Sequence, residues 1–198
     1  MKSLVLILAL VVAIPAFAQT RVVSVDAYDL AYSGGLAFRK DSGKGPDRDS
    51  TNFRLNLNYA QNFEQLVGVM WKVSARVNRF HEDYSSFDRK ESNFGVTGGL
   101  LYNFSADDVK NSALMGASVL VEHATFELGN GDDESGVNFG MILEAGKRFD
   151  LGAYSVANIS YAPTVSFEFK RYGGDIREKY FKSMNDLRFN FLKFDVLF

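Results

Sequence analysis

The sequence predicts an all-β fold, an eight-stranded antiparallel up-and-down transmembrane β-barrel with a polar interior. Three observations predict it. Apolar and polar residues alternate with a period of two over most of the chain. The connections between these segments alternate between long and short ones. The polar face carries charges of both signs in the middle of the strands, where a narrow barrel could pair them.

The start of the chain differs in character from the rest and predicts a signal peptide over residues 1–18. A basic start precedes an apolar run over residues 4–14, and Ala16 and Ala18 supply the small residues that signal peptidase accepts. The run is shorter than the roughly 20 residues that a membrane-spanning helix needs. We expect cleavage after Ala18, which leaves residues 19–198 as one barrel domain.

The composition excludes several classes of protein. The chain contains no cysteine, which excludes disulfides and thiolate metal sites. Loss of the leader with its one lysine leaves 21 basic against 24 acidic residues, so the charge does not indicate a nucleic-acid partner. Residues 129–136 are rich in Gly and Asp and could hold Ca²⁺, but they lack EF-hand spacing and are more typical of a solvated hairpin tip. We expect no metal site and no cofactor.

Eight segments are expected to form strands. The alternation is clearest at residues 52–59, 67–78, 94–104, 137–145 and 157–169, and its register is less certain at residues 28–38, 113–126 and 186–198.

Two of these segments leave their register open. Both faces of residues 113–126 are apolar, and we favour the face with Met115 and Val119 outward because that choice leaves Glu122 inside. In the last segment, Phe189 and Phe191 lie on the face opposite to Phe198, which indicates a bulge or a wrong register there.

The connections predict which end of the barrel faces outward. Short turns are typical of the periplasmic side of a transmembrane barrel, whereas its external loops are longer. Long polar connections are expected at residues 39–51, 80–92, 127–136 and 170–185, and short turns at residues 60–64, 105–111 and 149–153.

Ten charged residues are the candidate site, as a charge network in the barrel interior. Charges removed from water must be paired, and five basic side chains here oppose five acidic ones. The ten are Asp29, Arg54, Lys72, Arg76, Glu122, Glu144, Arg148, Glu168, Lys193 and Asp195.

Aromatic residues are expected to form two girdles at the membrane interfaces, one near the short turns and one near the long loops. The first contains Tyr59, Phe63, Tyr102, Phe104, Phe149 and Tyr154, and the second Phe38, Phe53, Phe94, Phe139, Phe167 and Phe169.

The end of the chain carries a family resemblance. Phe194, Val196 and the terminal Phe198 lie on one face of the last segment. A terminal phenylalanine on such a strand resembles the assembly signal of Gram-negative outer-membrane barrels, and the whole chain resembles the small barrels of the OmpA-barrel, OmpX and OmpW group. This resemblance implies an outer-membrane location, contact with membrane lipids and lipopolysaccharide, and recognition of these three residues by the barrel-assembly machinery.

The functional expectation is a monomeric barrel that anchors short surface loops, in an envelope-structural or surface-interaction role without catalysis. Long inward side chains should fill an eight-stranded lumen, so we expect no open pore. A narrow channel for small or amphipathic solutes is one alternative. An outer-membrane lipid-modifying enzyme that uses His123 is another, although no Ser-His-acid set matches. A secreted lipocalin-type barrel with its apolar residues inside is the alternative fold.

Overall fold

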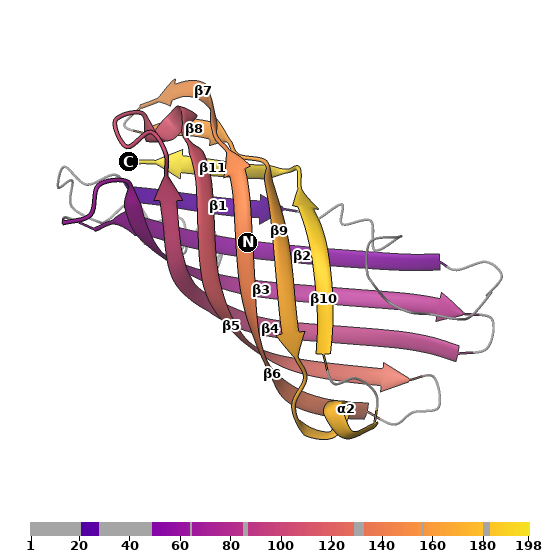
Figure 1. The fold of residues 1–198 in the computed structure, drawn as a ribbon. Coiled ribbons are helices and arrows are strands. Elements are labelled where there is room, and N and C mark those ends of the chain that lie inside the picture. The colour runs from indigo at the N-terminus through magenta and orange to yellow at the C-terminus, as the bar shows by residue number, and fades with distance from the viewer. Residues whose placement is uncertain are drawn as a thin grey trace.

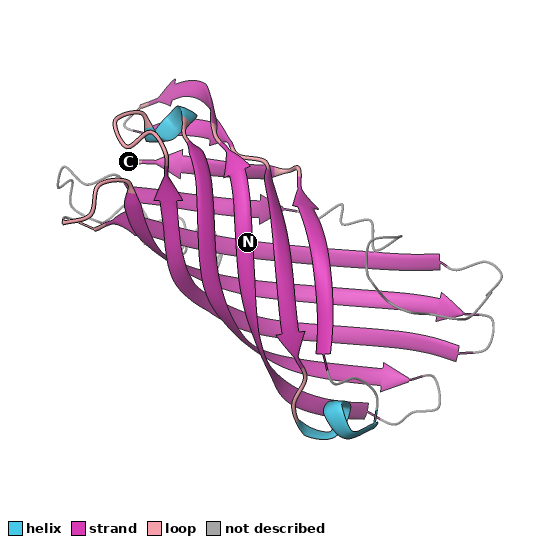
Figure 2. Cartoon of the chain, viewed as in Figure 1, coloured by secondary structure: helices cyan, strands magenta, loops and turns pink. Residues whose placement is uncertain are grey.

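The computed structural model describes residues 21–27, 49–63, 65–84, 87–128, 133–155, 157–179 and 183–198. These ranges form one curled antiparallel sheet of eleven strands and two short helices (Figure 1). The helices lie at opposite ends of the sheet (Figure 2). Neither helix in the described part of the chain is long and apolar enough to cross a membrane. The elements are β1 (Arg21–Ala27), β2 (Asp49–Asn62), β3 (Val69–Tyr84), β4 (Phe87–Asn103), η1 (Val109–Asn111), β5 (Ala113–Leu128), β6 (Asp133–Lys147), β7 (Phe149–Tyr154), β8 (Ala157–Tyr161), β9 (Thr164–Arg171), α2 (Gly174–Lys179), β10 (Ser183–Asn190) and β11 (Lys193–Leu197).

The order of the strands in the sheet is β10-β9-β6-β5-β4-β3-β2-β1-β11-β8-β7. Strands β1 to β6 pair in chain order, while β9 pairs with β6, and β11 pairs with both β1 and β8. Three pairs of strands that follow one another in the chain lie near opposite ends of this order: β6 and β7, β8 and β9, and β10 and β11. Residue 148 alone separates β6 from β7, residues 162–163 separate β8 from β9, and residues 191–192 separate β10 from β11.

Backbone hydrogen bonds hold these three interruptions against their neighbours. Lys147 N donates to Pro163 O at 3.3 Å, Ala162 N to Lys193 O at 2.9 Å, and Arg148 N to Ser112 O at 2.9 Å. Pro163 has no N–H group to give to a ladder, which explains why regular pairing stops at that point.

The described residues form eleven strands, whereas eight were predicted for the chain. The last predicted strand, residues 186–198, is split into β10 and β11, and the buried positions change from the even-numbered Arg188 to the odd-numbered Lys193 and Asp195. Residues 191–192 therefore shift the alternation by one position, as a bulge does. The irregularity expected near Phe191 is found.

Several predicted connections are strands. Residues 80–92 lie almost wholly in β3 and β4, which pair as far as Tyr84 with Phe87. In the same way β5 continues to Leu128, and residues 149–153 belong to β7. Polarity therefore does not prevent strands from pairing, because their backbone hydrogen bonds do not depend on the side chains.

The start of the sheet also differs from the prediction. Strand β1 occupies residues 21–27, which the sequence did not identify as a strand. The strand predicted over residues 28–38 lies outside the described residues.

The two faces of the sheet have opposite character. On β6 every second residue is exposed, and these exposed residues include Val137, Phe139, Met141 and Leu143. The fifth predicted segment has the expected orientation, since Val119 is 61 % exposed and Glu122 is 1 % exposed. Large apolar side chains therefore cover the outer face, and polar side chains are buried on the inner face.

Candidate functional site: a buried ion network

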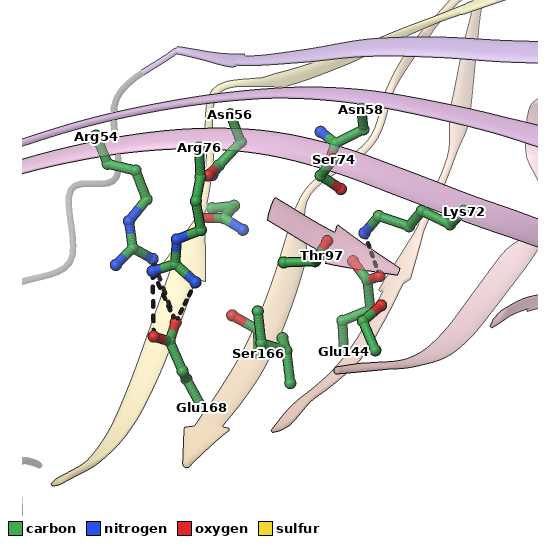
Figure 3. A pocket seen from close by; sticks show the side chains of 13 residues that line it. Arg54, Asn56, Asn58, Lys72, Ser74, Arg76, Thr97, Glu144, Ser166 and Glu168 are labelled. Carbon is green, nitrogen blue, oxygen red and sulfur yellow. Dashed lines mark hydrogen bonds and ion pairs between the residues drawn. The ribbon is translucent and has the colours of Figure 1, made fainter. Parts of the chain in front are cut away.

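Side chains from seven strands converge on one small polar cavity on the inner face (Figure 3). Its volume of about 40 Å³ is enough for a few water molecules. Its lining residues are Arg54, Asn56, Asn58, Lys72, Ser74, Arg76, Thr97, Ser118, Ile142, Glu144, Ser166, Glu168 and Asn190.

Glu168 on β9 is the centre of the network. Both terminal nitrogens of Arg76, which comes from β3, donate to its carboxylate at 3.1 Å. Three further cations lie close to that carboxylate: Arg188 at 3.4 Å, Lys170 at 3.5 Å and Arg54 at 3.7 Å. Figure 3 shows Arg54 and Arg76 reaching down to Glu168 from the opposite wall. One buried carboxylate is therefore shared by four cations from four strands, β2, β3, β9 and β10.

Glu122 on β5 is the second buried acid. Lys170 Nζ donates to its Oε1 at 2.7 Å, Asn138 Nδ2 donates to the same oxygen at 3.2 Å, and Arg76 Nε lies 3.7 Å from its Oε2. Gly95 stands between Arg76 and Glu122 in the register of β3, β4 and β5. A Cβ atom at Gly95 would lie 2.6 Å from the Glu122 Cβ, so the glycine leaves the space that this pair occupies.

A second group lies closer to the η1 end. Lys72 on β3 donates to Glu144 on β6, and Lys193 Nζ lies 3.7 Å from the same carboxylate. Gly116, which is opposite Glu144 in the register, would bring a Cβ within 2.9 Å of that side chain. The absence of a side chain at Gly116 again makes room for a buried ion pair.

Arg148 links η1 to the sheet through hydrogen bonds. It is almost fully buried at the break between β6 and β7, and its Nε donates to Asp195 Oδ2 on β11 at 2.6 Å. Its Nη1 donates to Asn103 Oδ1 and to the carbonyl of Val109 in η1, the latter at 3.5 Å. A single guanidinium thus joins the last strand, the end of β4 and the turn that contains η1.

Apolar layers lie on both sides of the charges on the inner face. Beyond Arg148, a layer around Met70 and the η1 residue Val109 is buried at the end where η1 lies. Beyond Glu122, Ile176 of α2 packs with Tyr172 and Phe126. The first layer, called here the inner seal, is Val22, Ala60, Met70, Leu101, Val109, Leu114 and Leu197, and the second, the outer seal, is Ala124, Phe126, Tyr172 and Ile176.

The structure brings together nine of the ten predicted network residues, and Asp29 lies outside the described residues. Sequence reasoning missed Lys170 and Arg188, which also pair with Glu168. Lys170 continues the period of Ser166 and Glu168, a signal that was available. Arg188 lies before the phase shift at residues 191–192, so an alternation counted back from Asp195 places it on the wrong face.

The other candidates lie elsewhere. His81 and His123 are both exposed, and His123 occupies the outer face, opposite in direction to its neighbour Glu122. In the described ranges, no group of His, Asp and Glu side chains could hold a metal ion. Phe194 and Phe198 of the proposed assembly signal are exposed and Val196 is half-buried, while Ala16 and Ala18 precede the described residues.

One partly exposed ion pair lies at the η1 end. Lys110 Nζ is 2.9 Å from Asp150 Oδ2. The lysine donates a hydrogen bond to this carboxylate, which lowers the pKa of Asp150 and raises the pKa of Lys110.

Aromatic rings cluster on the outer face near the same end. Tyr59 and Trp71 are 5.2 Å apart between ring centroids, and Tyr102 and Phe104 are 5.1 Å apart. The ring of Tyr161 lies between those of Phe149 and Phe194, at 6.3 and 5.8 Å.

Comparison with known proteins adds little to this description. No family model matches the chain, and no curated protein matches it. Among solved structures it is similar to Neisserial surface protein A (NspA), with 15 % sequence identity and a TM-score of 0.44, over 90 % of this chain and 93 % of that one.

Proposed function

We propose that the protein is a Gram-negative outer-membrane β-barrel that anchors surface-exposed hairpins, without catalysis and without an open pore. The observation that carries the proposal is the inversion of the two faces. Phe94, Met141 and Leu100 are 61 %, 54 % and 52 % exposed on the outer face, while Glu168 and Arg76 are buried on the inner face. A soluble β-barrel places its faces the other way round, whereas a barrel in lipid requires this arrangement.

The eleven strands support a closed barrel in which the chain crosses eight times. We take β6 and β7, β8 and β9, and β10 and β11 each as one interrupted crossing. The strand order then begins and ends with the same three crossings, in the same sequence. The pairing of β1 with β11 then supplies the closure. A closed sheet has no free edge in lipid, where an unpaired backbone group is costly.

The filling of the interior supports a barrel without an open pore. The paired charges around Glu168 occupy the middle of the inner face, and the inner and outer seals place apolar side chains beyond them. Ions cross an apolar constriction with difficulty because water leaves it. The small polar cavity keeps a narrow solute channel as the second candidate, and single-channel recordings in planar bilayers distinguish the two.

The lengths of the strands support a role at the cell surface. Strands β3 and β4 have 16 and 17 residues, whereas a tilted strand crosses the bilayer with about 9 to 11. Their far ends therefore project beyond the membrane as a hairpin, and Figure 1 shows β3 and β4 running side by side over their whole length. We propose this projecting hairpin as the surface that meets external partners.

The test of the barrel is its behaviour in lipid. Protein expressed with its leader should fractionate with the outer membrane, begin at Gln19, and change its gel mobility on boiling. Replacing Met141 with arginine should cost about 2–4 kcal/mol of unfolding free energy in lipid vesicles, the cost of a cation on the lipid face near the bilayer centre. Asp107→Arg, in an exposed turn, is the matched control. Equal stability of the two variants, or a freely soluble monomer, would refute the proposal.

A further inference from the structure

We propose that the outer face of β3 to β5 carries a binding site for the phosphate-bearing head group of a glycolipid in the outer leaflet. The inference rests on the proposed barrel and names a lipid site on it. The head-group patch consists of Arg79, Ser92 and Thr125, which are neighbours across three strands, together with Lys90 and His123. Its occupant is a lipid and not a free anion, because exposed apolar side chains continue directly from the patch.

The register places a cation and two hydroxyl groups side by side. Arg79 pairs with Ser92 across β3 and β4, and Ser92 pairs with Thr125 across β4 and β5. Arg79 is exposed, and the Thr125 hydroxyl donates to the Ser92 carbonyl at 3.2 Å, which fixes that side chain on the outer face. The Thr125 proton is therefore already given to that carbonyl, whereas the guanidinium of Arg79 and the hydroxyl of Ser92 can donate to phosphate oxygens, which accept several hydrogen bonds at once.

Further donors surround this row. Lys90 lies two residues from Ser92 on the same face, and its Nζ is 3.5 Å from Glu127 Oε1, so an acid already shares its charge. About half of both side chains remains exposed, which leaves the ammonium accessible to a second anion. His123 lies two residues from Thr125 and is also exposed. The acid next to Lys90 makes Arg79 the principal cation of the patch.

The apolar surface next to the patch has the position that acyl chains require. Phe94 follows Ser92 on the outer face of β4 and is 61 % exposed, and Val96 follows it at 53 %. A lipid whose chains lie against these residues brings its head group level with Arg79. Cations at the edge of an apolar belt attract anionic lipid head groups electrostatically. The exposed apolar side chains and the cation of Arg79 together therefore favour a lipid that carries phosphate.

The site can be tested with a defined lipid probe. Wild-type protein in dodecylmaltoside is titrated against a fluorescent bisphosphorylated lipid A and against its dephosphorylated form, and binding is followed by fluorescence anisotropy. We expect tighter binding of the phosphorylated probe, and the double variant Arg79→Gln, Lys90→Gln should weaken it about tenfold. Lys147→Gln, which removes an exposed cation near Phe149 at the η1 end, should leave the affinity unchanged.

The outcomes separate the site from the barrel. Equal affinity for the two lipids, an equal loss in Lys147→Gln, or wild-type affinity in the double variant would overturn the site alone. Displacement of the probe by inorganic phosphate at low concentration would show an anion site without lipid selectivity and would overturn it too. Failure of the wild type to insert into phosphatidylcholine vesicles would overturn the barrel, and the site with it.

Discussion

Replacing Glu168 with glutamine tests whether the ion network is sealed from water. The substitution keeps the volume of the side chain and removes its charge. Arg76, Arg54, Arg188 and Lys170 all lie within 3.7 Å of this carboxylate, and Glu168 is 1 % exposed. The variant therefore leaves buried cations without their shared counter-ion.

The expected loss is large because the charges are buried away from bulk water. Removing one partner of a buried ion pair costs about 3–5 kcal/mol, whereas an exposed pair is worth at most about 1 kcal/mol. Glu127→Gln is the matched control, since it removes the same charge from a pair with Lys90 that is half exposed. Urea titration of both variants in phosphatidylcholine vesicles should show a lower midpoint for Glu168→Gln at unchanged slope.

A second substitution strengthens the interpretation. Adding Arg54→Met to Glu168→Gln removes one of the cations that lose this carboxylate, so the double variant should be more stable than the sum of the single effects predicts. If Glu168→Gln and Glu127→Gln differ by less than about 1 kcal/mol, water reaches the network, and the reasoning about a sealed interior is wrong.

Three further predictions concern other parts of the fold. Arg148→Met removes the hydrogen bond to the buried Asp195 and the contacts that hold η1, so it should lose about 3–5 kcal/mol in the same urea titration and form the heat-modifiable barrel more slowly. Gly95→Val should cost about 1–3 kcal/mol through overpacking on the inner face, while Gly98→Val, where a Cβ meets nothing within 4 Å, should be tolerated; equal effects would contradict the assigned faces. The pKa of Asp150 is lowered in the folded protein, so its ion pair stabilises the fold above the ordinary carboxyl pKa and the effect is lost as the pH falls through the folded value; the melting difference between wild type and Asp150→Asn should vanish in acid and persist at neutral pH.

Local alternation was enough to predict much of the fold and most of the network. Residues such as Arg54 and Arg76 share a face with polar neighbours at every second position, and the structure places them inside. The direction of Glu122 was resolved by one physical argument, that a charge avoids the lipid side. The count of strands was not reproduced, because the interruptions at residues 148 and 162–163 break pairing without breaking the local pattern, and the interruption at residues 191–192 shifts the pattern by one position.

The ends of the strands were predicted poorly for a related reason. Residues 80–92 are polar enough to be interpreted as a loop, yet β3 and β4 remain paired through them. Hydrogen bonds to a neighbouring strand stabilise extended backbone whether its side chains meet lipid or water. Polarity along the chain marks where the apolar belt ends and not where the strands end.

The sequence by itself determined the all-β class, the period of two, and which side chains face inward along most strands. The tertiary structure alone decided which charges meet: Arg76 and Glu168 are 92 residues apart and lie on strands that are not neighbours in the sheet. It also decided that η1 folds against the inner face and that β11 lies between β1 and β8. The reason is that alternation is a property of one strand, whereas contacts across an interior depend on the curl and register of the whole sheet.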